Sequence, residues 1–182
     1  MNLYSLVVFS HIVATLGLFA GLTIEWVTVS ALKRANPAET RIWINLWPRL
    51  LPLTILSAVL LLASGIYLAA ITSAFRQGWI QISMLAVLII AVLGAVSNKQ
   101  ISAFGKETQG GGAVPAIVPL AVSCRTAIAL CVVLLMTVKS DLTESVAVVV
   151  IAIAAGLVHG IATRNVPSAM PPLGGIEKPE AL

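Results

Sequence analysis

The first apolar stretch of the chain, Leu3 to Leu32, is longer than a small soluble domain can bury as one helix. It runs for thirty residues with few polar side chains and ends at the basic pair Lys33–Arg34. About 20 apolar residues are enough for a helix to cross the hydrocarbon core of a bilayer. Because no basic segment precedes the stretch and its charges follow it, we predict a retained membrane helix and not a cleaved signal peptide.

The rest of the chain repeats this pattern. Hydrophobic residues make up 59% of the sequence and charged residues only 10%, whereas a soluble domain has about 25% charged residues. The sequence therefore predicts an all-α, polytopic membrane helical bundle of five transmembrane helices. We place this single domain at residues 1–164 and a Pro/Gly-rich cytoplasmic tail at 165–182. After the first span, the predicted spans are 53–74, 79–97, 116–138 and 146–163.

A short interfacial helix is predicted between the first and second spans. Asn36-Pro37-Ala38-Glu39 has the residues of a helix start, and two tryptophans near arginines suit the headgroup layer. Pro48 and Pro52 are predicted to bracket the turn into the membrane. The alternative is an amphipathic connector packed on the bundle. One face of this predicted helix consists of Ile42, Trp43, Leu46, Trp47 and Leu50.

The basic residues predict the orientation. With five spans, two of them fall on the side of the N-terminus and eight on the other side, and basic residues collect on the cytoplasmic side. We therefore expect a multi-pass protein of the bacterial inner membrane with its N-terminus outside and its C-terminus in the cytoplasm. The net charge of +4 is scattered over the loops, so it does not indicate a nucleic-acid partner. The expected partners are the lipid bilayer and either other membrane subunits or further copies of the chain.

Two opposite charges fall inside the predicted spans. Glu25 lies about two turns from the cytoplasmic end of the first span, and Arg125 lies at a similar depth in the fourth. Because charges at membrane depth are costly unless they pair, we predict an intramembrane pair. It is either a polar site or proton or ion relay, or a structural clamp. In a third interpretation the pair does not form, Arg125 extends to the surface, and Glu25 reaches the interface beside Trp26.

His11 is the main candidate ligand. It lies in the outer half of the first span, and fourteen residues separate it from Glu25, which leaves the two about 40° apart around a helix. Both should face the bundle interior, where Gly17 and Gly21 allow another helix to approach closely. A neutral histidine there can ligate haem iron or copper, or relay protons. It can equally hydrogen-bond a neighbouring carbonyl.

The second histidine, His159, is a weaker candidate because it lies deeper from the outer face than His11. A haem held by both histidines is therefore not expected, which leaves a single-histidine haem, or copper bound by His11 with a Met, Cys or Glu. The sequence contains no Met-x-x-Met, Cys-x-x-Cys or His-x-x-x-His pattern. No catalytic motif is found, and whether the protein is an enzyme stays open.

Several short motifs occur in the order found in a known family. The sequence resembles the membrane domain of the copper resistance D family and its small bacterial relatives over about residues 5–142. The resemblance implies a four-helix core plus one helix and a link to copper passage. The opening helix also looks like that of small haem-binding membrane proteins. The chain departs from copper-handling members in lacking methionine-rich motifs and a second outer-half histidine. The matching pieces are His11, Lys33–Arg34, Ser64-Gly65-Ile66-Tyr67-Leu68, Gly94-Ala95-Val96-Ser97-Asn98-Lys99, Arg125 and Leu135-Met136-Thr137-Val138-Lys139.

Two functions are therefore expected from the sequence. In the first, the bundle binds a metal ion or haem through His11 and takes part in the passage of an ion, an electron or a small molecule. In the second, the chain is a non-catalytic binding or scaffold subunit of a larger membrane complex, and its polar residues are structural.

Overall fold

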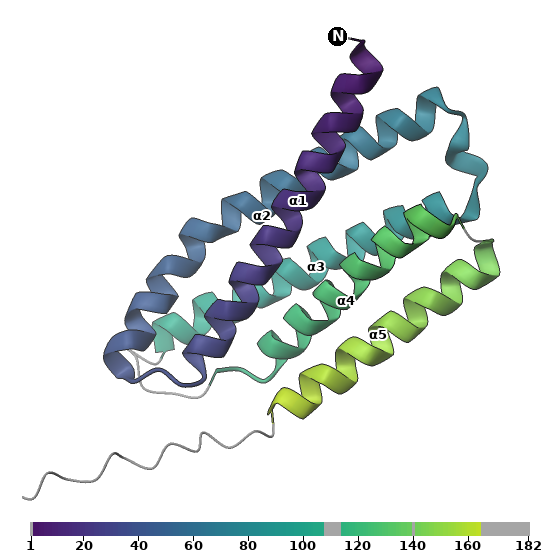
Figure 1. Cartoon of the computed structure of the whole chain (residues 1–182). Coiled ribbons are helices and arrows are strands. Elements are labelled where there is room, and N and C mark those ends of the chain that lie inside the picture. Colours follow the sequence, from purple (N-terminus) through teal and green to yellow (C-terminus); the bar gives the residue numbers. More distant parts are fainter. Residues whose placement is uncertain (1, 108–113, 140, 165–182) are drawn as a thin grey trace, which may run out of the picture.

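The computed structural model describes residues 2–107, 114–139 and 141–164. These ranges contain five α-helices, one short 3-10 helix and no strand (Figure 1). The predicted tail at 165–182 lies outside the described residues. The elements are α1 (Leu3–Leu32), α2 (Pro37–Ile71), η1 (Ala74–Arg76), α3 (Gly78–Glu107), α4 (Ile117–Val138) and α5 (Leu142–Arg164).

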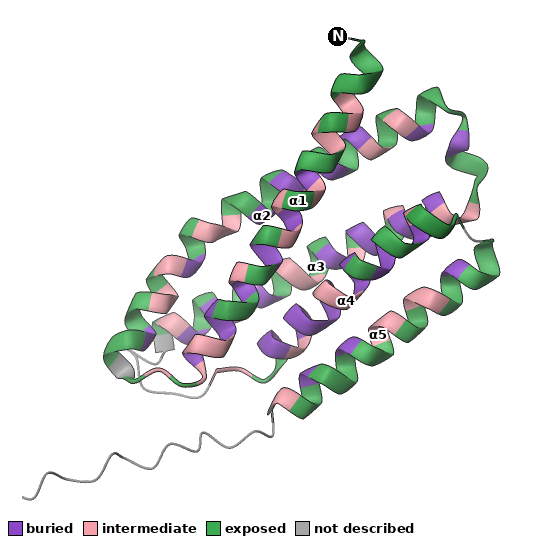
Figure 2. Cartoon of the chain, in the orientation of Figure 1, coloured by how far each residue is buried: buried purple, intermediate pink, exposed green. Residues whose placement is uncertain are grey.

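All five α-helices are long and apolar enough to cross a membrane, which confirms the predicted fold class. Their outward faces carry many exposed residues (Figure 2), and large apolar side chains such as Phe9, Leu16, Ile151 and Val158 are among them. A water-soluble protein rarely exposes so much contiguous apolar surface. The surface is instead what a lipid environment requires, and the chain is an integral, multi-pass membrane protein.

Four helices form the core and α5 lies outside it. Helix α1 packs along α2, α3 packs along α4, and α1 also contacts α4. Helix α4 is the most buried of the five and α5 the least, because α5 packs mainly against the outer side of α4. We call the end of the bundle at which α1 begins the N-terminal end. Helix α2 finishes and α3 starts at this end, at the upper right of Figure 1.

The connection between α1 and α2 differs from the prediction of a short interfacial helix. The helix starts as expected, because Asn36 accepts a hydrogen bond from the backbone of Glu39 and the Glu39 carboxylate accepts one from Asn36. It then continues without a break to Ile71, so Pro48 and Pro52 lie inside α2 and bracket no turn. A proline inside a helix removes one backbone hydrogen bond and its ring clashes with the preceding turn, at a cost of about 3 kcal/mol.

Burial of Trp47 explains why these first turns stay joined to the membrane helix. Its side chain is 4% exposed and packs against Val29, Ile101 and Val118. Its indole N–H donates to the Asn98 side chain at 3.3 Å. The same contacts lengthen α3, which runs to Glu107 although the sequence predicted a span ending near residue 97. Both helices exceed the roughly 20 residues that a bilayer requires.

The α1–α2 contact is close because small residues form it. A Cβ atom added to Gly17 would lie 2.4 Å from the Ser57 hydroxyl oxygen, and one added to Gly21 would lie 2.5 Å from that of Thr54. Glycines four residues apart let two membrane helices approach to backbone distance. The close approach that the sequence predicted at these glycines is therefore made by α2.

Candidate functional site

Glu25 and Arg125 form an ion pair in the interior of the bundle. Arg125 Nη1 donates to Glu25 Oε2, and the two residues are 3% and 4% exposed respectively. The second carboxylate oxygen of Glu25 accepts a hydrogen bond from the Thr54 hydroxyl at 3.2 Å. The interaction therefore links α1, α2 and α4 at one depth. Each charge is compensated locally, which lowers the cost of keeping it away from water.

The guanidinium of Arg125 lies against α3 at Gly94. A Cβ atom on Gly94 would come within 2.9 Å of Arg125 Nη2 and 3.0 Å of Cζ, so a larger residue at this position would displace the guanidinium. Arg125 Nε is buried and has no hydrogen-bond partner among the described residues. The site thus holds the charged ends of the pair firmly and leaves one N–H donor unused. The ion pair connects helices, and neither of its residues lines the cavity described below.

His11 is held in one tautomer by Ser64 of α2. The Ser64 hydroxyl lies 2.6 Å from the Leu60 carbonyl oxygen and 2.9 Å from His11 Nδ1. A hydroxyl has one proton to donate, and a carbonyl can only accept. The proton of Ser64 therefore goes to Leu60, and Nδ1 of His11 must carry the proton that it donates to Ser64. This leaves a lone pair on Nε2, the nitrogen that can bind a metal or accept a proton.

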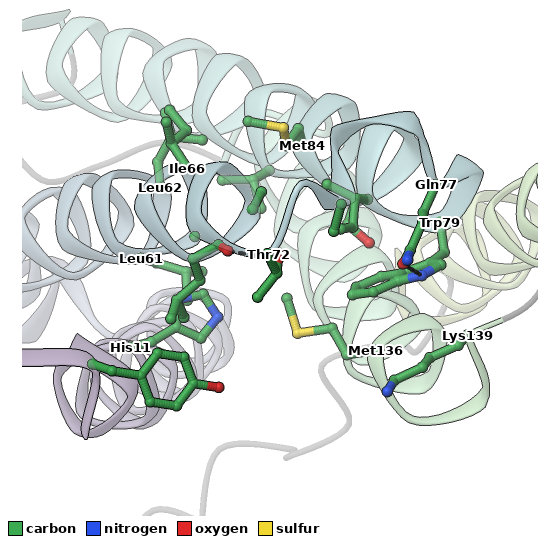
Figure 3. Close-up of a pocket in the computed structure, with 18 residues that line it drawn as sticks. His11, Leu61, Leu62, Ile66, Thr72, Gln77, Trp79, Met84, Met136 and Lys139 are labelled. Atoms are coloured by element: carbon green, nitrogen blue, oxygen red, sulfur yellow. Dashed lines mark hydrogen bonds between the residues drawn. The ribbon is translucent and has the colours of Figure 1, made fainter. Parts of the chain in front are cut away.

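A cavity of about 430 Å³ opens in front of His11 at the N-terminal end of the bundle. It lies between the α1–α2 pair and the α3–α4 pair, and Figure 3 shows the His11 ring on one side of it. Most of its wall is apolar. Its residues are Tyr4, His11, Leu61, Leu62, Gly65, Ile66, Leu68, Ala69, Thr72, Ala74, Gln77, Trp79, Ile80, Ser83, Met84, Val87, Met136 and Lys139.

Two methionines from different helices line the same cavity as His11. Met84 comes from α3 and Met136 from α4. Within the described ranges no three His, Cys, Asp or Glu side chains gather in a way that could hold a metal ion. The thioethers are therefore the additional soft donors that the cavity offers beside the His11 imidazole. Met84 lies in the first turns of α3 and Met136 in the last turn of α4, and these positions near one end of the bundle are the sequence signal that could have identified them.

His159 lies elsewhere. It is an exposed residue of α5 and stacks on Trp26 of α1, with ring centroids 6.5 Å apart and ring planes at 23°. Trp26 is fifteen residues beyond His11 on the same helix, which corresponds to about 22 Å. His159 and His11 therefore do not share a site.

Small polar side chains of α2 connect the level of His11 to that of Glu25 along the α1–α2 interface. Ser64 contacts His11, Ser57 lies against Gly17, and Thr54 contacts Glu25. These α2 residues have exposed fractions of 8%, 6% and 5% respectively, so the line is buried. The sequence alone does not identify any of them as a polar partner, because Ser and Thr are common in membrane helices.

Comparison with known proteins adds no assignment: no family model, no curated protein and no solved structure matches this chain.

Proposed function

We propose that this membrane protein binds a metal ion through His11 in the cavity at the N-terminal end and takes part in the passage of that ion. The observation that carries the proposal is the fixed tautomer of His11. Ser64 accepts the proton of Nδ1, so Nε2 has a free lone pair beside an apolar cavity. Metal-binding histidines are typically oriented in this way by a hydrogen bond from the other ring nitrogen.

The donor set favours a soft, monovalent ion. An imidazole nitrogen with thioether sulfurs suits Cu(I), whereas Mg²⁺ and Ca²⁺ require oxygen ligands. Among the described residues, no carboxylate lines the cavity. His11, Met84 and Met136 are the residues that would hold the ion. The relationship to the copper resistance D family, which the order of motifs predicted, belongs to this proposal.

The orientation and the route are further parts of it. With the N-terminus outside, the cavity opens toward the outer face, and Glu25 lies further inward, at the far end of the buried polar side chains that begin at Ser64. The protein then receives the ion from outside. The location is the bacterial inner membrane, as the distribution of basic residues favours.

Metal analysis of the purified protein tests the proposal. The protein is titrated with Cu(I) in competition with a chromogenic chelator, and its absorption spectrum is recorded. We expect one bound copper, its loss in His11→Ala, and an affinity about 10- to 100-fold lower in Ser64→Ala, the usual effect of removing the group that orients a ligating histidine. His159→Ala is the matched control, because this histidine is exposed and lies far from the cavity.

Two results would contradict the proposal. In the first, His11→Ala and the unaltered protein bind copper equally. His11 would then be a core residue that only forms a hydrogen bond with Ser64, and the protein would be better described as a scaffold subunit. A haem spectrum that disappears in His11→Ala would keep His11 as a ligand and replace copper by haem. Copper uptake into proteoliposomes, compared between the same variants, tests whether binding leads to passage.

A further inference from the structure

The part of the cavity away from His11 contains a second set of polar groups. Figure 3 shows Gln77, Trp79 and Lys139 on the side of the cavity opposite His11. Ser83 of α3 also lines the cavity. These residues come from the start of α3, the segment before it and the end of α4. A metal ion bound at His11 would not use these groups as ligands.

Ser83 is the clearest sign that this region binds something. It is 5% exposed, and its hydroxyl has no hydrogen-bond partner among the described residues. A buried hydroxyl without a hydrogen-bond partner destabilises a fold, because the group has lost its water and gained nothing in exchange. Other hydroxyls in the helices avoid this cost by donating to a carbonyl of the preceding turn, as Ser97 does to Leu93 at 2.9 Å. The Ser83 hydroxyl is therefore a donor without a partner among the described residues, in a residue that lines the cavity.

The polar groups of this region are mainly donors. The indole N–H of Trp79 can only donate, so the 2.8 Å contact with Gln77 fixes the Gln77 carbonyl oxygen toward Trp79 and leaves the amide NH₂ free to donate. Lys139 brings an ammonium group, and no carboxylate among the described residues forms an ion pair with it. Together with Ser83 these groups can surround an acceptor that carries negative charge.

We propose that the cavity binds an amphiphile with one apolar chain and an anionic head group, of the class of a long-chain carboxylate. The head group accepts hydrogen bonds from Ser83 and Gln77 and pairs with Lys139. The chain lies along the apolar wall formed by residues such as Leu61, Ile66 and Val87. The cavity volume of about 430 Å³ falls in the range of roughly 300–1,000 Å³ that small-molecule sites occupy.

Binding of radiolabelled oleate to the purified full-length protein tests this proposal. Oleyl alcohol has the same chain without the charge, and acetate has the charge without the chain. We expect saturable oleate binding that unlabelled oleate displaces, with oleyl alcohol at least about tenfold weaker, the size of one charge-assisted hydrogen bond. Acetate at the same concentration should displace nothing, because it buries no chain.

Two pairs of variants locate the site. Lys139→Gln should weaken the binding of oleate about tenfold. Arg76→Gln is its control, because it removes an exposed cation near the same end of the bundle that lies outside the cavity. Ser83→Ala should also weaken the binding of oleate. Ser97→Ala is its control, because it changes a buried serine of the same helix that lies outside the cavity. Equal losses within each pair, equal binding of oleate and oleyl alcohol, or no saturable binding would overturn the proposal.

The copper measurement on the same preparations separates this inference from the proposed function. Lys139→Gln and Ser83→Ala change no proposed metal ligand, so they should keep their copper. Loss of oleate binding with copper retained supports the amphiphile site whether or not the ion moves across the membrane. Copper binding without oleate binding would refute the amphiphile site and leave the metal proposal intact.

Discussion

Breaking the Glu25–Arg125 pair from one side should destabilise the protein more than removing both charges. Glu25→Gln leaves the Arg125 guanidinium buried at 3% exposure without a counter-charge, and its Nε already has no partner. Arg125→Met leaves the Glu25 carboxylate with the Thr54 hydroxyl as its remaining hydrogen-bond partner among the described residues. Loss of one member of a buried ion pair typically costs about 3–5 kcal/mol. The double variant leaves no orphan charge, so we expect it to be more stable than either single variant.

Equilibrium unfolding in mixed detergent and SDS micelles, followed by circular dichroism, measures these free energies of unfolding. The two single losses should add up to about 6–10 kcal/mol, and the double variant should lose much less than this sum. The matched control combines Lys99→Met with Glu144→Gln, two exposed charges for which the structure shows no ion pair with each other. That control should cost little and be additive. Additive losses at Glu25 and Arg125 would refute the energetic coupling that the geometry implies.

Two further predictions concern the membrane topology and the α1–α2 interface. Single cysteines placed by Asn2→Cys and Ser168→Cys, in a background without the native cysteines, should react with an impermeant thiol reagent from opposite sides of the membrane; labelling of both from one side would remove a span. Gly21→Leu should lower the stability in detergent by about 1–3 kcal/mol, because the added Cβ alone would meet the Thr54 hydroxyl at 2.5 Å. Ala20→Leu, one position away on an exposed face, should have almost no effect, and equal losses would contradict the interface.

The number of helices could be predicted because it depends only on the length and composition of apolar segments. Each span is long enough to cross a bilayer and is separated from the next by charged or turn-forming residues. The boundaries of α2 and α3 could not be predicted in this way. They depend on contacts between distant segments, such as the hydrogen bond from Trp47 to Asn98, and no local pattern contains that information.

The partner of Arg125 was accessible from sequence, whereas the partner of His11 was not. Membrane charges are rare, so two opposite charges at one depth restrict the pairing strongly. His11 is satisfied by Ser64, one of several serines and threonines that the depth alone permits. Choosing among them requires the rotation of α2 about its own axis. A helix that is apolar on all sides does not reveal this rotation, because it has no polar face to orient it.

The two sites lie on either side of a tightly packed layer, and this arrangement restricts how the protein can move an ion. Leu18 and Leu22 lie between His11 and Glu25 along α1 and pack against Ile90 of α3 and Ile128 of α4. All four side chains are at most 3% exposed. The cavity is therefore closed on its inner side by contacts between the α1–α2 pair and the α3–α4 pair. The Gly17 and Gly21 contacts make the α1–α2 pair a close-packed unit. Passage from the cavity toward Glu25 thus requires the two pairs to separate at this layer, because moving α1 away from α2 would break the close contacts at both glycines.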